Sequence, residues 1–194
     1  MTTEPHVVLV VEDERDLADL YTAWLADTWT VRTAHDYATA VDRLDGAVDV
    51  ALLDRRLPDG SGDDVLAAIE AREIDCRAAM VTAVEPDFDI VEMGFDDYLV
   101  KPVSRDDLHE AVDRLSSLAT YDERVREYFA LASKKAVLDA EKSPAARETS
   151  DEYARLVDDL AAVRETVDAT LDDLDGAEHR AVLRDLPPSD SPDR

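Results

Sequence analysis

Five short runs rich in β-branched residues alternate with amphipathic stretches along the first 120 residues, and this alternation most constrains the fold. The stretches between the runs carry apolar residues at helical spacing, which predicts helices. Alternating strands and helices predict a parallel sheet that is covered on both faces. We therefore expect an α/β domain, a flavodoxin-like, doubly wound five-stranded parallel sheet. The expected strands span residues 6–11, 29–34, 48–53, 78–82 and 97–100.

The remainder of the chain, from residue 104, shows no strand pattern and predicts helices. A break at Ser143 and Pro144 divides it, because this pair can stop one helix or cap the next. Apolar residues at spacings of three and four follow, as in a coiled coil or a helical hairpin. We expect an antiparallel hairpin of 105–142 against 151–175, with the last helix of the α/β part running straight into its first arm. The predicted domains are 1–120, a helical domain at 121–186 and a disordered tail at 187–194.

The chain is strongly acidic. It has 47 Asp and Glu residues against 21 Lys and Arg, a formal net charge of -26. Such a charge disfavours contact with nucleic-acid phosphates and anionic membranes. Abundant acid with scarce lysine is typical of a halophilic cytoplasm; an acidic mesophilic protein with a disordered tail is the alternative. We see no signal peptide and no membrane span, so we expect a cytoplasmic protein. The single Cys76 excludes an intramolecular disulfide.

Polar residues follow four of the five expected strands. They are Glu12 and Asp13 after the first, Asp54 after the third, Thr82 at the end of the fourth and Lys101 after the fifth. The carboxyl ends of parallel strands meet at one edge of a sheet, so these side chains should converge. Three crowded carboxylates need a cation to remain ionised together, and hard oxygen ligands select Mg²⁺ or Mn²⁺.

A carboxylate at the end of a buried strand can also act as a nucleophile. We expect Asp54 to form an aspartyl phosphate, with Thr82 and Lys101 stabilising charge on the phosphoryl oxygens. Simpler interpretations exist for each residue alone. Asp54 could cap the turn before the next helix. Glu12 and Asp13 could be an acidic cluster at a helix N-terminus, which the helix dipole favours, and Thr82 could be an N-cap.

Four spaced motifs carry a resemblance to a known family. They are "VVEDE" with Glu12 and Asp13, "LLDRRLPDGSG" with Asp54, "MVTA" with Thr82, and "YLVKP" with Lys101. Together they resemble the receiver domain of two-component response regulators, similar to chemotaxis-type receivers, over residues 6–118.

The resemblance implies roles for single residues. Asp54 is the phosphoacceptor, and Lys101 and Thr82 bind the phosphoryl group. Mg²⁺ is held by Glu12, Asp13, Asp54 and the backbone carbonyl of Arg56. Tyr98 rotates inward on activation. A sensor histidine kinase is the implied partner, and no catalysis is implied beyond phosphoryl acceptance and slow self-dephosphorylation.

The helical part resembles the HalX domain found after receivers in halophilic archaea, which implies transcription regulation. A homodimer paired through the last strand and the helices beside it is one arrangement in which phosphorylation could act. Direct DNA binding is left open, since acidic residues outnumber basic ones in this part. The alternative function is a phosphorylation-independent pseudo-receiver that serves as a protein-interaction scaffold.

Overall fold

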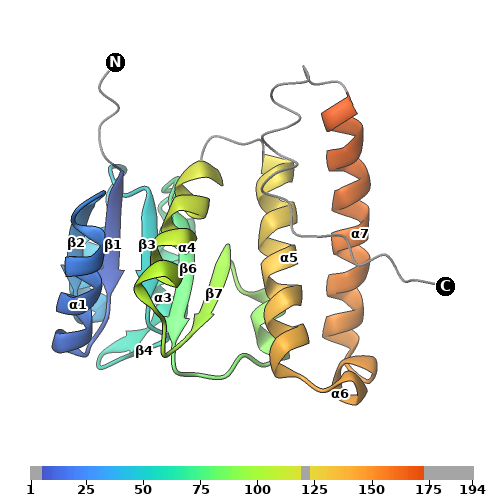
Figure 1. The fold of residues 1–194 in the computed structure, drawn as a ribbon, viewed down its shortest axis with the longest axis horizontal. Coiled ribbons are helices and arrows are strands. Elements are labelled where there is room, and N and C mark those ends of the chain that lie inside the picture. The colour runs from blue at the N-terminus through green and yellow to red at the C-terminus, as the bar shows by residue number, and fades with distance from the viewer. Residues whose placement is uncertain (1–5, 119–122, 173–194) are drawn as a thin grey trace.

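The computed structural model describes residues 6–118 and 123–172 and contains the predicted five-stranded parallel sheet (Figure 1). Its strand order is β2-β1-β3-β6-β7, with the crossovers of a doubly wound sheet. The predicted fold class is confirmed. The strands are β1 (Val7–Val11), β2 (Thr30–Ala34), β3 (Val50–Leu53), β6 (Arg77–Thr82) and β7 (Asp97–Val100).

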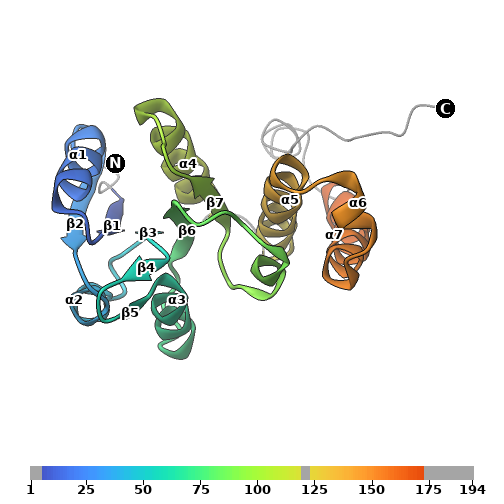
Figure 2. The ribbon, with the colours of Figure 1, turned by 90° about the horizontal axis from the view of Figure 1, so that it is seen from below.

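Helices cover both faces of the sheet (Figure 2). On one face lie α1 (Arg15–Leu25) and α4 (Arg105–Leu118), and on the other lie α2 (Tyr37–Arg43) and α3 (Gly62–Ala71). Side chains alternate along β1, so that Val8 and Val10 enter one apolar core while Leu9 and Val11 enter the other. The near-continuous apolar strands are explained by this double coverage.

Local sequence fixes several helix starts. The amide of Ser104 donates to the carboxylate of Asp107 at 3.0 Å, and the amide of Asp107 donates to the Ser104 hydroxyl at 3.2 Å. Ser61 and Asp64 form the same reciprocal box at the start of α3. Each box satisfies backbone N–H groups that have no partner within the helix. Just before α3, two short strands that the sequence did not predict, β4 (Arg56–Leu57) and β5 (Gly60–Ser61), pair antiparallel.

The fourth amphipathic stretch forms only a short 3-10 helix, η1 (Phe88–Glu92). The Asp87 side chain accepts from the Phe88 amide at 2.9 Å and starts it. Ile90 is its fully buried side chain. A single short turn covers little of the sheet, so other elements pack at β7.

Those elements are α5 (Glu123–Glu141) and α7 (Asp151–Asp172), which form an antiparallel hairpin joined through α6 (Pro144–Glu148). Figures 1 and 2 show α5 beside β7, the edge strand of the sheet. Ser143 caps α6, since its hydroxyl accepts from the Ala146 amide at 3.3 Å. We refer to α5, α6 and α7 together as the hairpin.

The expected first arm of the hairpin, one helix over 105–142, is wrong. Helix α4 ends at Leu118 and packs on α1 and the sheet, whereas α5 begins at Glu123 and packs against β7, η1 and α7. The physical reason is that the two apolar stripes face different partners. Leu108 and Leu115 of α4 are buried over β3 and β6, while α5 turns its stripe toward β7 and η1.

The hairpin shares both apolar cores with the sheet. Tyr128 and Phe129 of α5 join the core under α1 and α4, and Leu138 of α5 with Leu156 of α7 joins the core on the opposite side. The boundary between 1–120 and 121–186 stays a prediction, and the predicted tail at 187–194 lies outside the described residues. Within the described ranges, no helix combines the length and apolarity needed to cross a bilayer.

Candidate functional site

The carboxylates predicted to converge do so. Glu12, Asp13 and Asp54 each place an oxygen within 4.8 Å of the others. Glu12 and Asp54 are buried, and Asp13 is exposed. They meet because β1 and β3 are neighbouring parallel strands in register, with Val11 opposite Leu53, so both strands end at the same edge.

The Lys101 ammonium compensates the negative charge of the two buried carboxylates. Its Nζ lies 2.6 Å from Glu12 Oε2 and 2.5 Å from Asp54 Oδ2. Burial raises the pKa of Glu12, and the Lys101 ammonium opposes that rise. Burial alone would lower the pKa of Lys101, but its hydrogen bonds to Asp54 and Glu12 raise it overall. The ammonium therefore stays charged and holds both carboxylates in place.

The second oxygen of Asp54 is held by neutral donors. The Thr82 hydroxyl donates to Asp54 Oδ1 at 2.9 Å, and the Arg56 amide donates to the same atom at 3.0 Å. Both carboxylate oxygens thus have a fixed direction at the end of β3. A nucleophile oriented in this way loses little freedom when it reacts.

The donor set fits a magnesium ion. All three candidate ligands are carboxylates, and Mg²⁺ binds through one or two carboxylates while keeping waters and substrate phosphate oxygens. Asp13 stands on the solvent side of the cluster and the other two on the protein side. The predicted role of the Arg56 carbonyl stays a prediction, since only its amide makes a described contact with Asp54.

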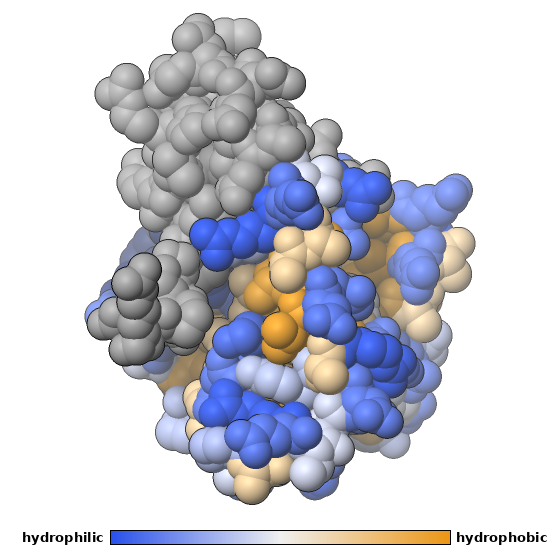
Figure 3. All heavy atoms as spheres, turned by 90° about the vertical axis from the view of Figure 1, so that its right-hand side faces the viewer, coloured by the Kyte–Doolittle hydropathy of each residue, from blue (hydrophilic) through white to orange (hydrophobic). Residues whose placement is uncertain are grey.

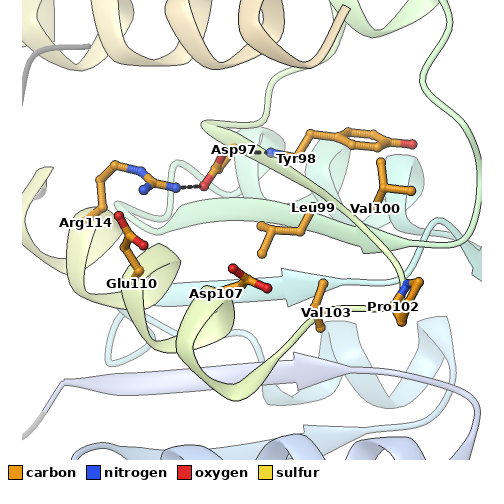
Figure 4. Close-up of a pocket in the computed structure, with 9 residues that line it drawn as sticks. All are labelled: Asp97, Tyr98, Leu99, Val100, Pro102, Val103, Asp107, Glu110 and Arg114. Carbon is orange, nitrogen blue, oxygen red and sulfur yellow. Dashed lines mark hydrogen bonds and ion pairs between the residues drawn. The ribbon is translucent and has the colours of Figure 1, made fainter. Parts of the chain in front are cut away.

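Tyr98 lies on the inner side of β7. Its hydroxyl donates to the Val84 carbonyl at 2.7 Å, and its ring centroid is 5.5 Å from that of Phe95. Figure 4 shows Tyr98 and Leu99 leaving the strand on opposite sides. Burial raises the pKa of Tyr98, and the Arg55 guanidinium opposes the rise. The structure therefore holds the predicted switch residue in a buried position.

Sequence reasoning did not single out Arg55, which directly follows Asp54 in the loop after β3. It forms ion pairs with Asp63 of α3 and with Asp89 of η1. Only 17% of this side chain is exposed. The available signal was its place directly after Asp54, but the sequence does not show which way the side chains of Arg55 and Arg56 point.

A separate hollow of about 320 Å³ lies between β7 and α4, and Figure 4 shows the side chains that line it. At one end of it, Arg114 of α4 forms an ion pair with Asp97 of β7. Asp107 and Glu110 lie along the α4 side. The hollow does not include the carboxylate cluster, so it belongs to the seam between α4 and the edge strand.

Comparison with known proteins agrees with this geometry. The family profile of the response regulator receiver domain matches residues 8–113, more than half of the chain. The chain belongs to the response regulator receiver family. A HalX domain profile matches residues 117–183, in the region of the hairpin. Both resemblances drawn from the sequence are confirmed.

Relatives of this receiver are regulators. A Haloferax volcanii protein described as a transcriptional regulator is 48% identical over 179 residues, which are 92% of this chain and 28% of that protein. The transcriptional regulatory protein CpxR of Escherichia coli is 37% identical over 99 residues, 49% of this chain and 42% of CpxR. The chain thus spans less than half the length of either relative.

Solved receiver domains share the fold. The non-phosphorylated HemR receiver domain from Leptospira biflexa aligns with a TM-score of 0.52 and 28% identity over 61% of this chain and 97% of that one. The response regulator TrrA from Thermotoga maritima, in complex with Mg²⁺ and BeF, aligns with a TM-score of 0.50 and 26% identity over 57% and 98% of the two chains. The receiver part of this chain therefore has the fold of these solved receiver domains.

Proposed function

We propose that this response regulator accepts a phosphoryl group on Asp54 from the phosphohistidine of a sensor kinase, in a Mg²⁺-dependent reaction. The observation that carries the proposal is the grouping of Glu12, Asp13, Asp54, Thr82 and Lys101 at one edge of the sheet. A pseudo-receiver would have no need for a lysine and a hydroxyl on the same carboxylate.

The chemistry follows from the contacts of Asp54. Its carboxylate attacks phosphorus, an O–P bond forms, and the P–N bond to the partner's imidazole breaks with its electron pair returning to nitrogen. Lys101 and the Thr82 hydroxyl already lie on the two oxygens of Asp54, so both are placed to donate to the incoming phosphoryl oxygens. Bound Mg²⁺ would neutralise part of the charge on these oxygens.

The output belongs to transcription regulation in this proposal, because the relatives that match are transcriptional regulators. The hairpin is the segment available to carry it. Figure 3 shows its outer side as mostly hydrophilic, with hydrophobic residues gathered near the middle. Acidic side chains outnumber basic ones on α7, which disfavours unspecific contact with phosphates. Protein contacts of the hairpin are therefore favoured over direct DNA binding.

The test of the phosphoacceptor is a mass measurement. Incubation with a small phosphodonor such as acetyl phosphate and Mg²⁺ should add the mass of one phosphoryl group to the wild type, in acid-labile form. The Asp54→Asn variant should gain nothing, because an amide is not a nucleophile. EDTA should abolish the gain in the wild type.

Asp45→Asn is the matched control. Asp45 is an exposed carboxylate that pairs with Arg32, far from the cluster, so this variant should be labelled like the wild type. An unlabelled wild type under these conditions would instead support the pseudo-receiver interpretation.

A further inference from the structure

A second hollow, of about 1010 Å³, lies between α3, the start of β6 and α5. Its lining residues differ from those of the hollow beside α4 and from the carboxylate cluster. The short helix η1 and the loop that follows it lie between α3 and α5 and leave this space open (Figure 2). Its apolar lining includes Leu66 and Ile69 of α3, Ile74 before β6, Met93 after η1 and Leu131 of α5. The receiver fold and the hairpin thus form this hollow together.

Two arginines in the lining, Arg77 of β6 and Arg126 of α5, share one carboxylate. Arg77 Nη2 lies 2.6 Å and Arg126 Nη1 lies 3.3 Å from the same atom, Asp75 Oδ1. The two arginine side chains are 17% and 22% exposed, whereas that of Asp75 is 74% exposed. Each guanidinium has five N–H donors, and within the described ranges the Nε of both is buried without a hydrogen-bond partner. A single oxygen of an exposed side chain therefore serves two guanidinium groups that can donate further hydrogen bonds.

Most other charged groups in the lining are already engaged. Lys134 is 6% exposed, and its ammonium donates to the Val91 carbonyl at 3.1 Å and to the Met93 carbonyl at 2.5 Å. Four of the five acidic residues make ion pairs or hydrogen bonds: Asp63, Glu92, Asp96 and Glu127. Asp63 keeps one buried oxygen without a described partner, but it lies at the start of α3, at the opposite edge of the sheet from Arg77. The unused hydrogen-bonding capacity beside the two arginines is therefore suited to an acceptor.

A carboxylate from another molecule would gain from this arrangement. The ion pairs of Asp75 involve an exposed carboxylate, and such pairs contribute little because water solvates the free charges well. Inside the hollow the same guanidinium groups would bind an acceptor in a less solvated place, where charge-assisted hydrogen bonds are stronger and arginine can donate in pairs. Exchange of Asp75 for such an acceptor is therefore favourable. The remaining space suits apolar side chains, which gain free energy when they leave water for the apolar lining.

The length of the hollow favours a stretch of polypeptide as its occupant. Lining residues follow α5 from Arg124 to Lys134, which corresponds to about 15 Å of helix. At about 1010 Å³ the hollow is also at the upper limit for small-molecule sites, which reach roughly 1000 Å³. A short peptide with a carboxylate next to apolar residues matches its length, its charge and its apolar lining.

We propose that this hollow, the α3–α5 groove, is a docking site for a peptide segment of a partner protein that carries a carboxylate beside apolar side chains. Arg77 and Arg126 bind the carboxylate, and the apolar lining contacts the neighbouring side chains. The receiver fold and the hairpin each supply one arginine, so the groove is specific to their combination. Docking there does not require phosphoryl acceptance on Asp54, which is a separate function of the chain.

The experiment titrates the ¹⁵N-labelled full chain with the peptide acetyl-Leu-Asp-Leu-Leu-amide and follows backbone amide chemical shifts. We expect saturable shifts within 66–70, 76–78 and 124–134, with a dissociation constant of about 1 mM or lower. The twin peptide acetyl-Leu-Asn-Leu-Leu-amide keeps the apolar side chains and replaces the carboxylate with an amide. It should bind at least about tenfold more weakly, because hydrogen bonds between charged groups are stronger than those of a neutral amide.

Variants of the two arginines and of their exposed partner should change the affinity in opposite directions. Arg77→Gln and Arg126→Gln should each weaken peptide binding by about tenfold. Asp75→Asn frees both guanidinium groups from their ion pairs and should tighten binding by roughly two- to fivefold. Arg105→Gln is the matched control and should bind like the wild type, since Arg105 lies on α4, is exposed and pairs with Asp27. Misfolding cannot tighten binding, so the gain in Asp75→Asn separates recognition from stability.

Docking of such a segment is disproved if the two peptides bind equally, if the arginine variants bind like the wild type, or if the shifts lie outside the groove. It is also disproved if acetate binds as tightly as the peptide, since the site would then take only a small anion. Light scattering tests another occupant: a wild-type dimer that Arg126→Gln converts to a monomer would assign the groove to a second copy of the chain. None of these results changes the labelling of Asp54, which tests the proposed function separately.

Discussion

Replacing Lys101 with methionine should lower the free energy of unfolding by about 3 kcal/mol at neutral pH in the presence of EDTA. The ammonium lies on the buried carboxylates of Glu12 and Asp54, and methionine leaves both without their cation. Removing one partner of a buried ion pair costs more than the pair contributes, because a buried charge remains uncompensated. Urea unfolding followed by circular dichroism measures the difference.

The loss of unfolding free energy in Lys101→Met should be smaller in acid, because Glu12 can then become neutral. Its folded-state pKa is raised above the ordinary value by burial, and without Lys101 it should rise further. A carboxyl group with a raised folded pKa stabilises the protein below its unfolded pKa, and that stability is lost as pH rises through the folded pKa. The variant should therefore approach the wild type as pH falls from 7 toward 5, where protonation of Glu12 removes the unpaired charge.

The second measurement is how much Mg²⁺ raises the free energy of unfolding of the Lys101→Met variant and of the wild type. A divalent ion among Glu12, Asp13 and Asp54 would replace the missing charge, so Mg²⁺ should stabilise the variant more than the wild type. Lys135→Met is the control, since its pair with Asp139 is less buried and should contribute no more than about 1 kcal/mol. Equal stabilisation of both proteins by Mg²⁺ would argue against a cation site at the cluster.

The convergence of these groups could be predicted because it follows from strand ends alone. In a parallel sheet every carboxyl end lies at one edge, so locating the strands placed Glu12, Asp54, Thr82 and Lys101 together. The predicted strands required only local information, namely apolar runs with turn residues after them. The reciprocal hydrogen bonds between Ser104 and Asp107 at the start of α4 are local in the same sense.

The features that could not be predicted from the sequence depend on packing between segments that are distant along the chain. No glycine or proline interrupts residues 105–141, so periodicity predicted one helix, yet the two apolar stripes need different partners and the chain forms α4 and α5. The burial of Lys134 depends in the same way on η1 lying beneath it. A side chain's exposure is set by the element packed against it, and no pattern within α5 specifies that element.

The close approach of Gly62 to the Asp54 main chain also depends on packing between distant segments. A substitution at Gly62 is therefore the second change for which we expect a large effect. A Cβ added at Gly62 would lie 2.6 Å from the main-chain oxygen of Asp54 and 3.2 Å from Arg55 Cα. The Gly62 amide also donates to the Arg55 carbonyl at 3.1 Å, which holds the start of α3 against the loop that follows Asp54. Backbone atoms cannot move aside as a side-chain tip can, so the loop must shift.

Gly62→Ala should therefore lower the free energy of unfolding by about 2 to 3 kcal/mol, in the upper range for overpacking. Because the displaced atoms belong to Asp54 itself, labelling by acetyl phosphate should also slow by at least about tenfold, as expected for a misplaced nucleophile. Gly46→Ala is the matched control. It meets no atom within 4 Å and its φ is not positive, so alanine there should be neutral or stabilising by up to about 1 kcal/mol.

The two substitutions add the same methyl group, and only its surroundings differ. If Gly62→Ala were as stable and as readily labelled as Gly46→Ala, the loop would have to tolerate displacement of the Asp54 main chain. Asp54 would then not depend on a fixed position between Thr82 and Lys101, and the preorganised carboxylate on which the proposed chemistry relies would be wrong. A slowed reaction with intact stability would instead locate the effect in the orientation of Asp54.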